Sequence, residues 1–122
     1  ATPTPTGGPT NTPTKTPTPT TTPVAPAAVI NLSSSSNGTV NGVSYKDEDI
    51  LSYTGSNGWS MLFDGSDVGV GNADVDAFYI MGDGSILMSF DKPINLSSLG
   101  QVADADIVKF TPTQLGNTTS AD

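Results

Sequence analysis

Residues 77–90 read AFYIMGDGSILMSF, and this stretch decides the fold class of the chain. Two apolar runs, 77–81 and 86–90, flank the tetrapeptide Gly-Asp-Gly-Ser, a composition typical of a tight turn between antiparallel strands. Both runs place apolar side chains on both of their faces, which is typical of strands in the middle of a structure. The stretch therefore predicts a β-hairpin that is covered on both sides, by its own chain or by neighbouring subunits.

Short apolar runs separated by Gly, Asp, Ser and Asn clusters continue on both sides of this hairpin, without sustained 3.6-residue periodicity. Ile50–Thr54 and Trp59–Phe63 flank the turn-type residues 55–58 and predict a second hairpin. Ile107–Thr111 predicts a fifth strand. The sequence thus predicts an all-β domain at residues 44–122, built as one small antiparallel sheet or sandwich of about five strands.

Trp59 is the only tryptophan of the chain, and two interpretations of its role are open. The two-residue period of a strand places Trp59, Met61 and Phe63 on one face, which favours packing of Trp59 in the core. Alternatively, Trp59 is a sugar-stacking platform in a carbohydrate-binding module. That second interpretation requires an exposed Trp59 with Tyr45 or Tyr53 beside it.

The composition excludes several classes of function. The chain has no cysteine and no histidine, so a disulfide framework, a Cys-ligated metal and a histidine general base are all impossible. All twelve acidic residues lie at or after Asp47, where only three lysines oppose them, and such a surface repels nucleic acid and anionic membranes. The longest apolar run, Val24–Ile30, is far shorter than the ~20 residues that span a bilayer. Neither a nucleophile motif nor a phosphate-binding loop occurs, so we expect no enzyme.

The first 26 residues contain eleven Thr and eight Pro, with a single charge at Lys15. Proline fixes its own φ and favours extended backbone at the preceding residue, so this segment predicts a semi-rigid polyproline II arm rather than part of a core. Two interpretations are open: a linker between domains, or a stalk that is O-glycosylated on threonine. The candidate O-glycosylation sites are Thr2, Thr4, Thr6, Thr10, Thr12, Thr14, Thr16, Thr18, Thr20, Thr21 and Thr22.

Residues 27–43 are expected to connect this arm to the β domain. The apolar segment Val24–Leu32 is a candidate donor strand for a neighbouring copy, because an open strand edge can pair with a strand of another chain. Four Asn-x-Ser/Thr sequences follow, and they are acceptors if the protein passes through an N-glycosylation pathway. These candidate sites are Asn31, Asn37, Asn95 and Asn117.

Residues 64–76 gather four carboxylates in a Gly-rich segment. Calcium takes six to eight oxygen ligands from carboxylates, carbonyls and water, so the residue types fit a calcium site, although the spacing does not match an EF-hand loop. The other interpretation is that these Asp and Gly residues shape turns, since Asp side chains accept hydrogen bonds from nearby backbone amides. The four candidate ligands are Asp64, Asp67, Asp74 and Asp76.

An internal repeat is visible in the sequence. DEDILSYT at residues 47–54 aligns with DADIVKFT at residues 104–111, with the pattern Asp-x-Asp, two aliphatic residues, a polar residue, an aromatic residue and Thr. The acidic residues at the start of each copy are expected to form strand-entry turns or solvated edges. One unit and the beginning of another are therefore present.

The run WSMLFDGSDVGVGNADVDAFYIMGDGSILMSFD at residues 59–91, followed by DADIVKFTPTQLG at residues 104–116, resembles a bacterial extracellular repeat that occurs in tandem. The resemblance covers roughly residues 47–119, and Phe-Asp-Gly-Ser-Asp-Val-Gly is its most specific part. It implies a small antiparallel sheet similar to a propeller blade, an extracellular setting and no catalytic residue. One unit cannot close a propeller.

The Thr/Pro arm together with a small β unit is also similar to subunits of environmental glycosylated extracellular fibrils. We therefore expect a secreted structural subunit, trimmed from a longer precursor, that forms a homopolymer through β-strand or arm contacts and carries covalent glycans. Calcium is the one cofactor that the sequence suggests, and none is required. The alternative is a carbohydrate- or surface-binding module with its Thr/Pro linker.

Overall fold

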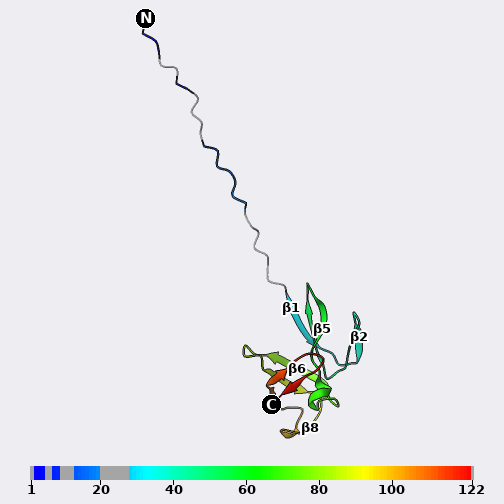
Figure 1. The fold of residues 1–122 in the computed structure, drawn as a ribbon. Helices are drawn as coiled ribbons and strands as arrows, with labels where there is room; N and C mark the ends of the chain where they lie inside the picture. Colours follow the sequence, from blue (N-terminus) through cyan, green and yellow to red (C-terminus); the bar gives the residue numbers. More distant parts are fainter. Residues whose placement is uncertain (1, 5–6, 9–12, 20–27, 122) are drawn as a thin grey trace.

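The computed structural model describes residues 2–4, 7–8, 13–19 and 28–121, and these residues form an all-β fold (Figure 1). The predicted fold class is confirmed: the strands form several small antiparallel sheets, and none of these closes into a barrel. Within the described residues no helix is long and apolar enough to cross a membrane.

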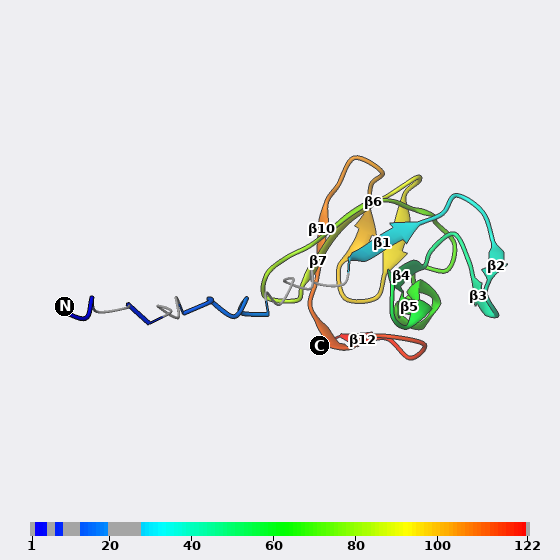
Figure 2. The same ribbon diagram turned by 90° about the horizontal axis from the view of Figure 1, so that it is seen from above.

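Two three-stranded sheets make up most of the fold. The N-terminal sheet has the order β1-β4-β5, with β1 at Val29–Ser33, β4 at Ile50–Thr54 and β5 at Gly58–Phe63. The C-terminal sheet has the order β10-β7-β6, with β6 at Val75–Ile80, β7 at Ile86–Phe90 and β10 at Val108–Phe110. β1 lies next to β6, so the two sheets adjoin along these strands (Figure 2).

Three two-stranded hairpins complete the described fold. They are β2–β3 (Gly38–Val40 and Val43–Tyr45), β8–β9 (Ile94–Leu96 and Gly100–Val102) and β11–β12 (Pro112–Gln114 and Ser120–Ala121). Asn41 and Gly42 at the tip of β2–β3 both have positive φ, as a two-residue hairpin turn requires. A short 3₁₀ turn, η1 (Gly65–Val68), follows β5.

The core lies between the two sheets. Ile50 and Phe63 of the N-terminal sheet are fully buried against the C-terminal sheet, and the Phe63 ring meets the Phe110 ring edge to face at a centroid distance of 5.1 Å. Hairpin β8–β9 adds apolar side chains at one end. The buried core residues are Ile50, Phe63, Val70, Ala73, Val75, Ile86, Met88, Phe90, Ile94, Leu96 and Val102.

Both predicted hairpins are present: β4 pairs antiparallel with β5, and β6 pairs antiparallel with β7. The bounds of β4 and β7 match the predicted strands, and β5, β6 and β10 differ from prediction by one or two residues at their ends. The predicted sheet or sandwich is divided into several small sheets, and seven further strands accompany the five predicted ones among the described residues.

The segment 27–43, expected to be a connecting arm, contributes strands to this fold. β1 pairs with β4 of the same chain along all five of its residues, and β2 is in a hairpin with β3. Residues 29–32, which belong to the candidate donor segment Val24–Leu32, are therefore paired within one copy. Residues 24–27 of that segment lie outside the described residues.

Trp59, Met61 and Phe63 do not share one face, contrary to the sequence prediction. The register between β4 and β5 shifts at Ile50/Leu51, so that Ile50 pairs with Phe63 while Leu51 pairs with Met61. Directly paired residues of antiparallel strands lie on the same face, so this bulge turns Phe63 toward the core and Met61 with Trp59 to the opposite face.

Candidate functional site

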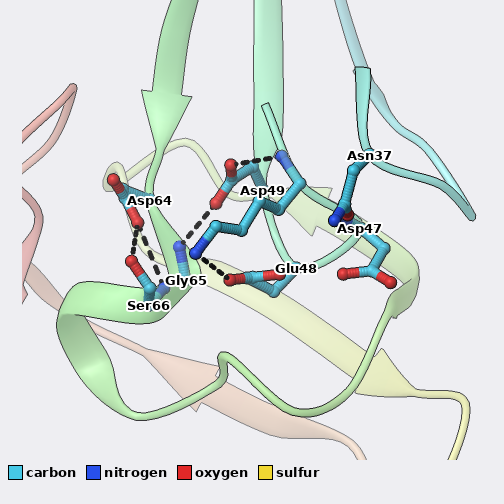
Figure 3. Close-up of polar contacts among 8 residues, drawn as sticks. Asn37, Asp47, Glu48, Asp49, Asp64, Gly65 and Ser66 are labelled. Atoms are coloured by element: carbon cyan, nitrogen blue, oxygen red, sulfur yellow. Dashed lines mark hydrogen bonds and ion pairs between the residues drawn. The ribbon is translucent and has the colours of Figure 1, made fainter. Parts of the chain in front are cut away.

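Hydrogen bonds and an ion pair connect the acidic turn before β4 with η1 and with its own backbone (Figure 3). The backbone N–H of Lys46 donates to Asp49 Oδ2 at 2.8 Å, and the N–H of Asp49 donates to the Lys46 carbonyl at 3.1 Å. Asp49 Oδ1 accepts the N–H of Gly65 at 3.0 Å and so ties the turn to η1. Burial raises the pKa of Asp49.

Glu48 lies in the middle of this turn and is buried, with 1 % of its surface exposed. Its Oε1 atom is 3.6 Å from the Nζ of the exposed Lys46, and no hydrogen-bond donor reaches it. Burial raises the pKa of Glu48, and a side-chain hydrogen bond with Glu48 lowers the pKa of its neighbour Asp47. The turn thus holds one carboxyl group that takes up a proton more readily than a free glutamate.

The glycines of the following loop allow this burial. A Cβ atom on Gly65 would overlap the backbone carbonyl and the side chain of Glu48, and one on Gly71 would stand 3.5 Å from Glu48 Oε1. Glycine at position 65 therefore lets the loop pass directly over the turn.

The second copy of the repeat builds the same turn before β10. The N–H of Ala103 donates to Asp106 Oδ2 at 2.9 Å, and the N–H of Asp106 donates to the Ala103 carbonyl at 3.1 Å. Both copies thus form strand-entry turns, one of the two alternatives that the sequence left open. They differ in their surroundings, because Asp106 is exposed whereas Asp49 is buried beneath η1.

The four candidate calcium ligands have different surroundings: Asp64, Asp67 and Asp74 lie between β5 and β6, and Asp76 lies in β6. Asp64 caps η1 and accepts hydrogen bonds from the N–H and hydroxyl of Ser66. Asp67 Oδ2 accepts the N–H of Thr119 at 2.8 Å. Burial raises the pKa of Asp74, which is half-buried beside Asp47, and Asp76 is exposed.

The contacts of Asp64 and Asp67 agree with the turn-shaping interpretation. Among the residues that the structure describes, no three acidic side chains converge as a metal site would require. The calcium site stays a prediction from the sequence.

An aromatic pair lies on the outer side of the N-terminal sheet. Trp59 and Tyr53 face each other across β5 and β4 with ring centroids 5.1 Å apart, and both are half-exposed. Ile30 of β1 pairs with Tyr53 and extends the row, with 53 % of its surface exposed. Of the two interpretations of Trp59 that the sequence left open, the favoured one was core packing, and the bulge at Leu62, which has no signal in the residue pattern, overturns it.

A cavity of about 640 Å³ opens between η1, β10 and the C-terminal strand β12. Its floor is apolar and includes Phe63, Val108 and Phe110, and its rim carries Asp67 and Lys109.

The predicted glycosylation sites differ in accessibility. Asn37, Asn95 and Asn117 are exposed, but Asn31 lies in β1, where its Oδ1 is buried without a hydrogen-bond partner. Thr2, Thr4, Thr14, Thr16 and Thr18 are exposed and belong to no strand. The remaining candidates lie outside the described residues: Thr6, Thr10, Thr12, Thr20, Thr21 and Thr22.

Comparison with protein-family models, with curated proteins and with solved structures yields no match to this chain.

Proposed function

We propose that the chain is a structural subunit of a secreted extracellular fibre, in which copies associate through their β faces and the Thr/Pro arm carries glycans. The observation that carries this proposal is the exposure of large apolar side chains at both sheets of an otherwise acidic protein: Ile30 on the N-terminal sheet, Tyr79 on the C-terminal sheet and Ile107 directly before β10. Apolar surface of this kind on a small domain is typical of protein contacts.

The arm supports the glycan part of the proposal. The described threonines of the arm are exposed, and the arm offers up to eleven hydroxyl acceptors within its first 22 residues. Glycans on an extended Thr/Pro chain stiffen it and keep it in solvent, which suits a stalk or the coat of a fibre.

Two measurements on native material test this proposal. Intact mass is expected to exceed the 12.4 kDa of the bare chain by heterogeneous sugar-sized steps that map to residues 2–22. Light scattering and electron microscopy at increasing concentration are expected to show filaments. A protein that stays monomeric at millimolar concentration would contradict the fibre, and a bare mass would contradict the glycan coat.

The second candidate function is a carbohydrate-binding module, and the Tyr53–Trp59 pair favours it. Stacking on a sugar requires half-exposed aromatic rings side by side, as these two are. Titration with oligosaccharides is then expected to change the tryptophan emission, and Trp59→Ala is expected to abolish binding. Tyr79→Ala, a change on the other sheet, is the matched control. Emission that no sugar alters would count against this function.

A further inference from the structure

The internal repeat extends well beyond the eight residues visible in the sequence. β1, hairpin β2–β3, the acidic turn and β4 follow one another as do β7, hairpin β8–β9, the second turn and β10. The strand pairing is equivalent as well: Ile30 pairs with Tyr53 as Ile86 pairs with Phe110, and Leu32 pairs with Leu51 as Met88 pairs with Val108. The β1–β4 and β7–β10 pairs, with the hairpin and turn between their strands, are therefore two copies of one structural unit. The third strand of each sheet lies outside this unit, since β5 pairs with β4 whereas β6 pairs with β7.

The repeat relates each face of the N-terminal sheet to one face of the C-terminal sheet. The core face of the C-terminal sheet carries Ile86, Met88 and Phe110, whose equivalents on the N-terminal sheet belong to its outer face. This outer face is defined here by Ile30, Leu32, Leu51, Tyr53, Trp59 and Met61. Leu51 is already buried within one copy, with 2 % of its surface exposed, whereas Ile30 is 53 % exposed. A face that is covered in one unit is thus open to solvent along part of the other.

The opposite faces of the two sheets also differ in exposure, although the repeat makes them equivalent. Ile50, on the core face of the N-terminal sheet, has no exposed surface, whereas its repeat equivalent Ile107 is 72 % exposed. Ile107 lies with Tyr79 and Leu87 around a shallow apolar hollow on the outer face of the C-terminal sheet. This outer face is defined by Ala77, Tyr79, Leu87, Lys109 and Ile107.

We propose that the outer face of the C-terminal sheet packs against the outer face of the N-terminal sheet of a second copy of this chain. Within one copy, the face that carries Ile50 covers the face that carries Ile86 and Met88. The contact between copies repeats this packing, with Ile107 in the place of Ile50 and with Ile30 and Leu32 in the places of Ile86 and Met88. The packing of the two sheets within one copy thus serves as the template for the contact between copies.

Charge favours the same pairing. Copies with a net charge of −8 repel one another, so a stable contact needs surfaces that carry little net negative charge. None of the residues that define the outer face of the N-terminal sheet is charged. Lys109 is the only charged residue that defines the other face, and its Nζ is 3.4 Å from Asp83 Oδ2.

The two faces belong to different sheets, so the contact is head to tail. A heterologous contact that does not close into a ring produces an open filament. This inference rests on the proposed fibre function and adds to it the surfaces that meet. It also assigns Trp59 to an interface between copies rather than to a sugar.

Crosslinking tests the surfaces directly, because the native chain has no cysteine. The double variant Ile30→Cys/Ile107→Cys, assembled and treated with a short flexible bismaleimide, is expected to give a ladder of oligomers on a denaturing gel. The matched control is Ile30→Cys/Leu99→Cys, since Leu99 is similarly exposed but lies outside both faces. A ladder no stronger than that of the control overturns the proposal.

A charge placed on one face gives an independent test. Ile107→Asp is expected to raise the concentration needed for assembly at least tenfold and to remove the blue shift of Trp59 emission on assembly, while Leu99→Asp changes neither. Circular dichroism verifies that both variants fold. Filaments that Ile107→Asp leaves unchanged refute these surfaces but keep the fibre function, whereas a wild-type chain that never assembles refutes both.

Discussion

At the scale of single residues, the unusual feature is a buried carboxyl group with few stabilising contacts. Glu48 is covered by the glycine loop, and its Oε1 lacks a hydrogen-bond donor. An exposed lysine at 3.6 Å offsets only part of the cost of removing this charge from water, because such pairs are weakened by solvent. Buried Glu48 therefore lowers the free energy of unfolding by an amount that depends on pH.

Replacing Glu48→Gln is expected to stabilise the protein at pH 7 by about 1 kcal/mol, because the buried position no longer holds a charge. Burial raises the folded pKa of Glu48 above its ordinary 4.5. The native state therefore binds the proton more tightly than the unfolded chain, so this contribution to stability is present below pH 4.5 and is lost as the pH rises through the folded pKa.

Urea unfolding of wild type and Glu48→Gln between about pH 4 and pH 7 measures this effect. The difference between the two proteins should vanish near pH 4 and grow toward pH 7. The exposed Asp104→Asn is the control, and an equal response of both variants would contradict a role for burial.

Gly65→Ala is expected to destabilise the fold by about 2 kcal/mol, since the new Cβ would overlap the backbone carbonyl of Glu48, which cannot move aside. Gly55→Ala is the matched control, because nothing lies within 4 Å of a Cβ at that position. Thermal unfolding of both variants makes the comparison. Equal melting temperatures would show that the loop does not pass tightly over the turn.

At the scale of elements, the same turn occurs before β4 and before β10 with nearly equal hydrogen-bond lengths. Its formation is local, because the Asp carboxylate reaches back three residues to a backbone amide. A turn of local origin can be expected from the sequence alone, and strand-entry turns were one of the two alternatives for these acidic residues. Their different burial depends on η1, which covers Asp49 only.

Asp49→Ala is therefore expected to cost about 2 kcal/mol, because it leaves the N–H groups of Lys46 and Gly65 without their acceptor. Asp106→Ala removes one exposed turn bond and is expected to cost about 0.5 kcal/mol. Denaturant unfolding of the two variants compares their losses in free energy of unfolding. A larger loss in Asp106→Ala than in Asp49→Ala would contradict the assignment of Asp49 to the buried copy of the turn.

The alternation of residues predicted the bounds of the strands better than it predicted the face on which each side chain lies. Alternation located β5 within one residue, but the bulge at Leu62 reversed the face of Trp59 and Met61 relative to Phe63. A bulge adds one residue without changing the composition, so the period-2 rule has no means of detecting it.

At the scale of the whole molecule, the chain combines a β fold of two related sheets with an arm rich in Thr and Pro. The described residues of the arm are exposed and belong to no strand. Removing residues 1–26 is accordingly expected to change the free energy of unfolding of the β fold by less than about 0.5 kcal/mol. Urea unfolding followed by Trp59 emission measures this change, and a larger loss would mean that the arm packs on the sheets.

The sequence by itself determined the all-β class, the β4–β5 and β6–β7 hairpins and the two acidic turns, because each depends on residues close together in the chain. Tertiary structure alone decided the division into two sheets, the pairing of β1 with β4, the burial of Glu48 and the exposure of Ile107. Ile50 and Ile107 occupy equivalent positions in the repeat, yet one is buried and the other exposed. The difference arises from packing between segments distant in sequence, which no local pattern encodes.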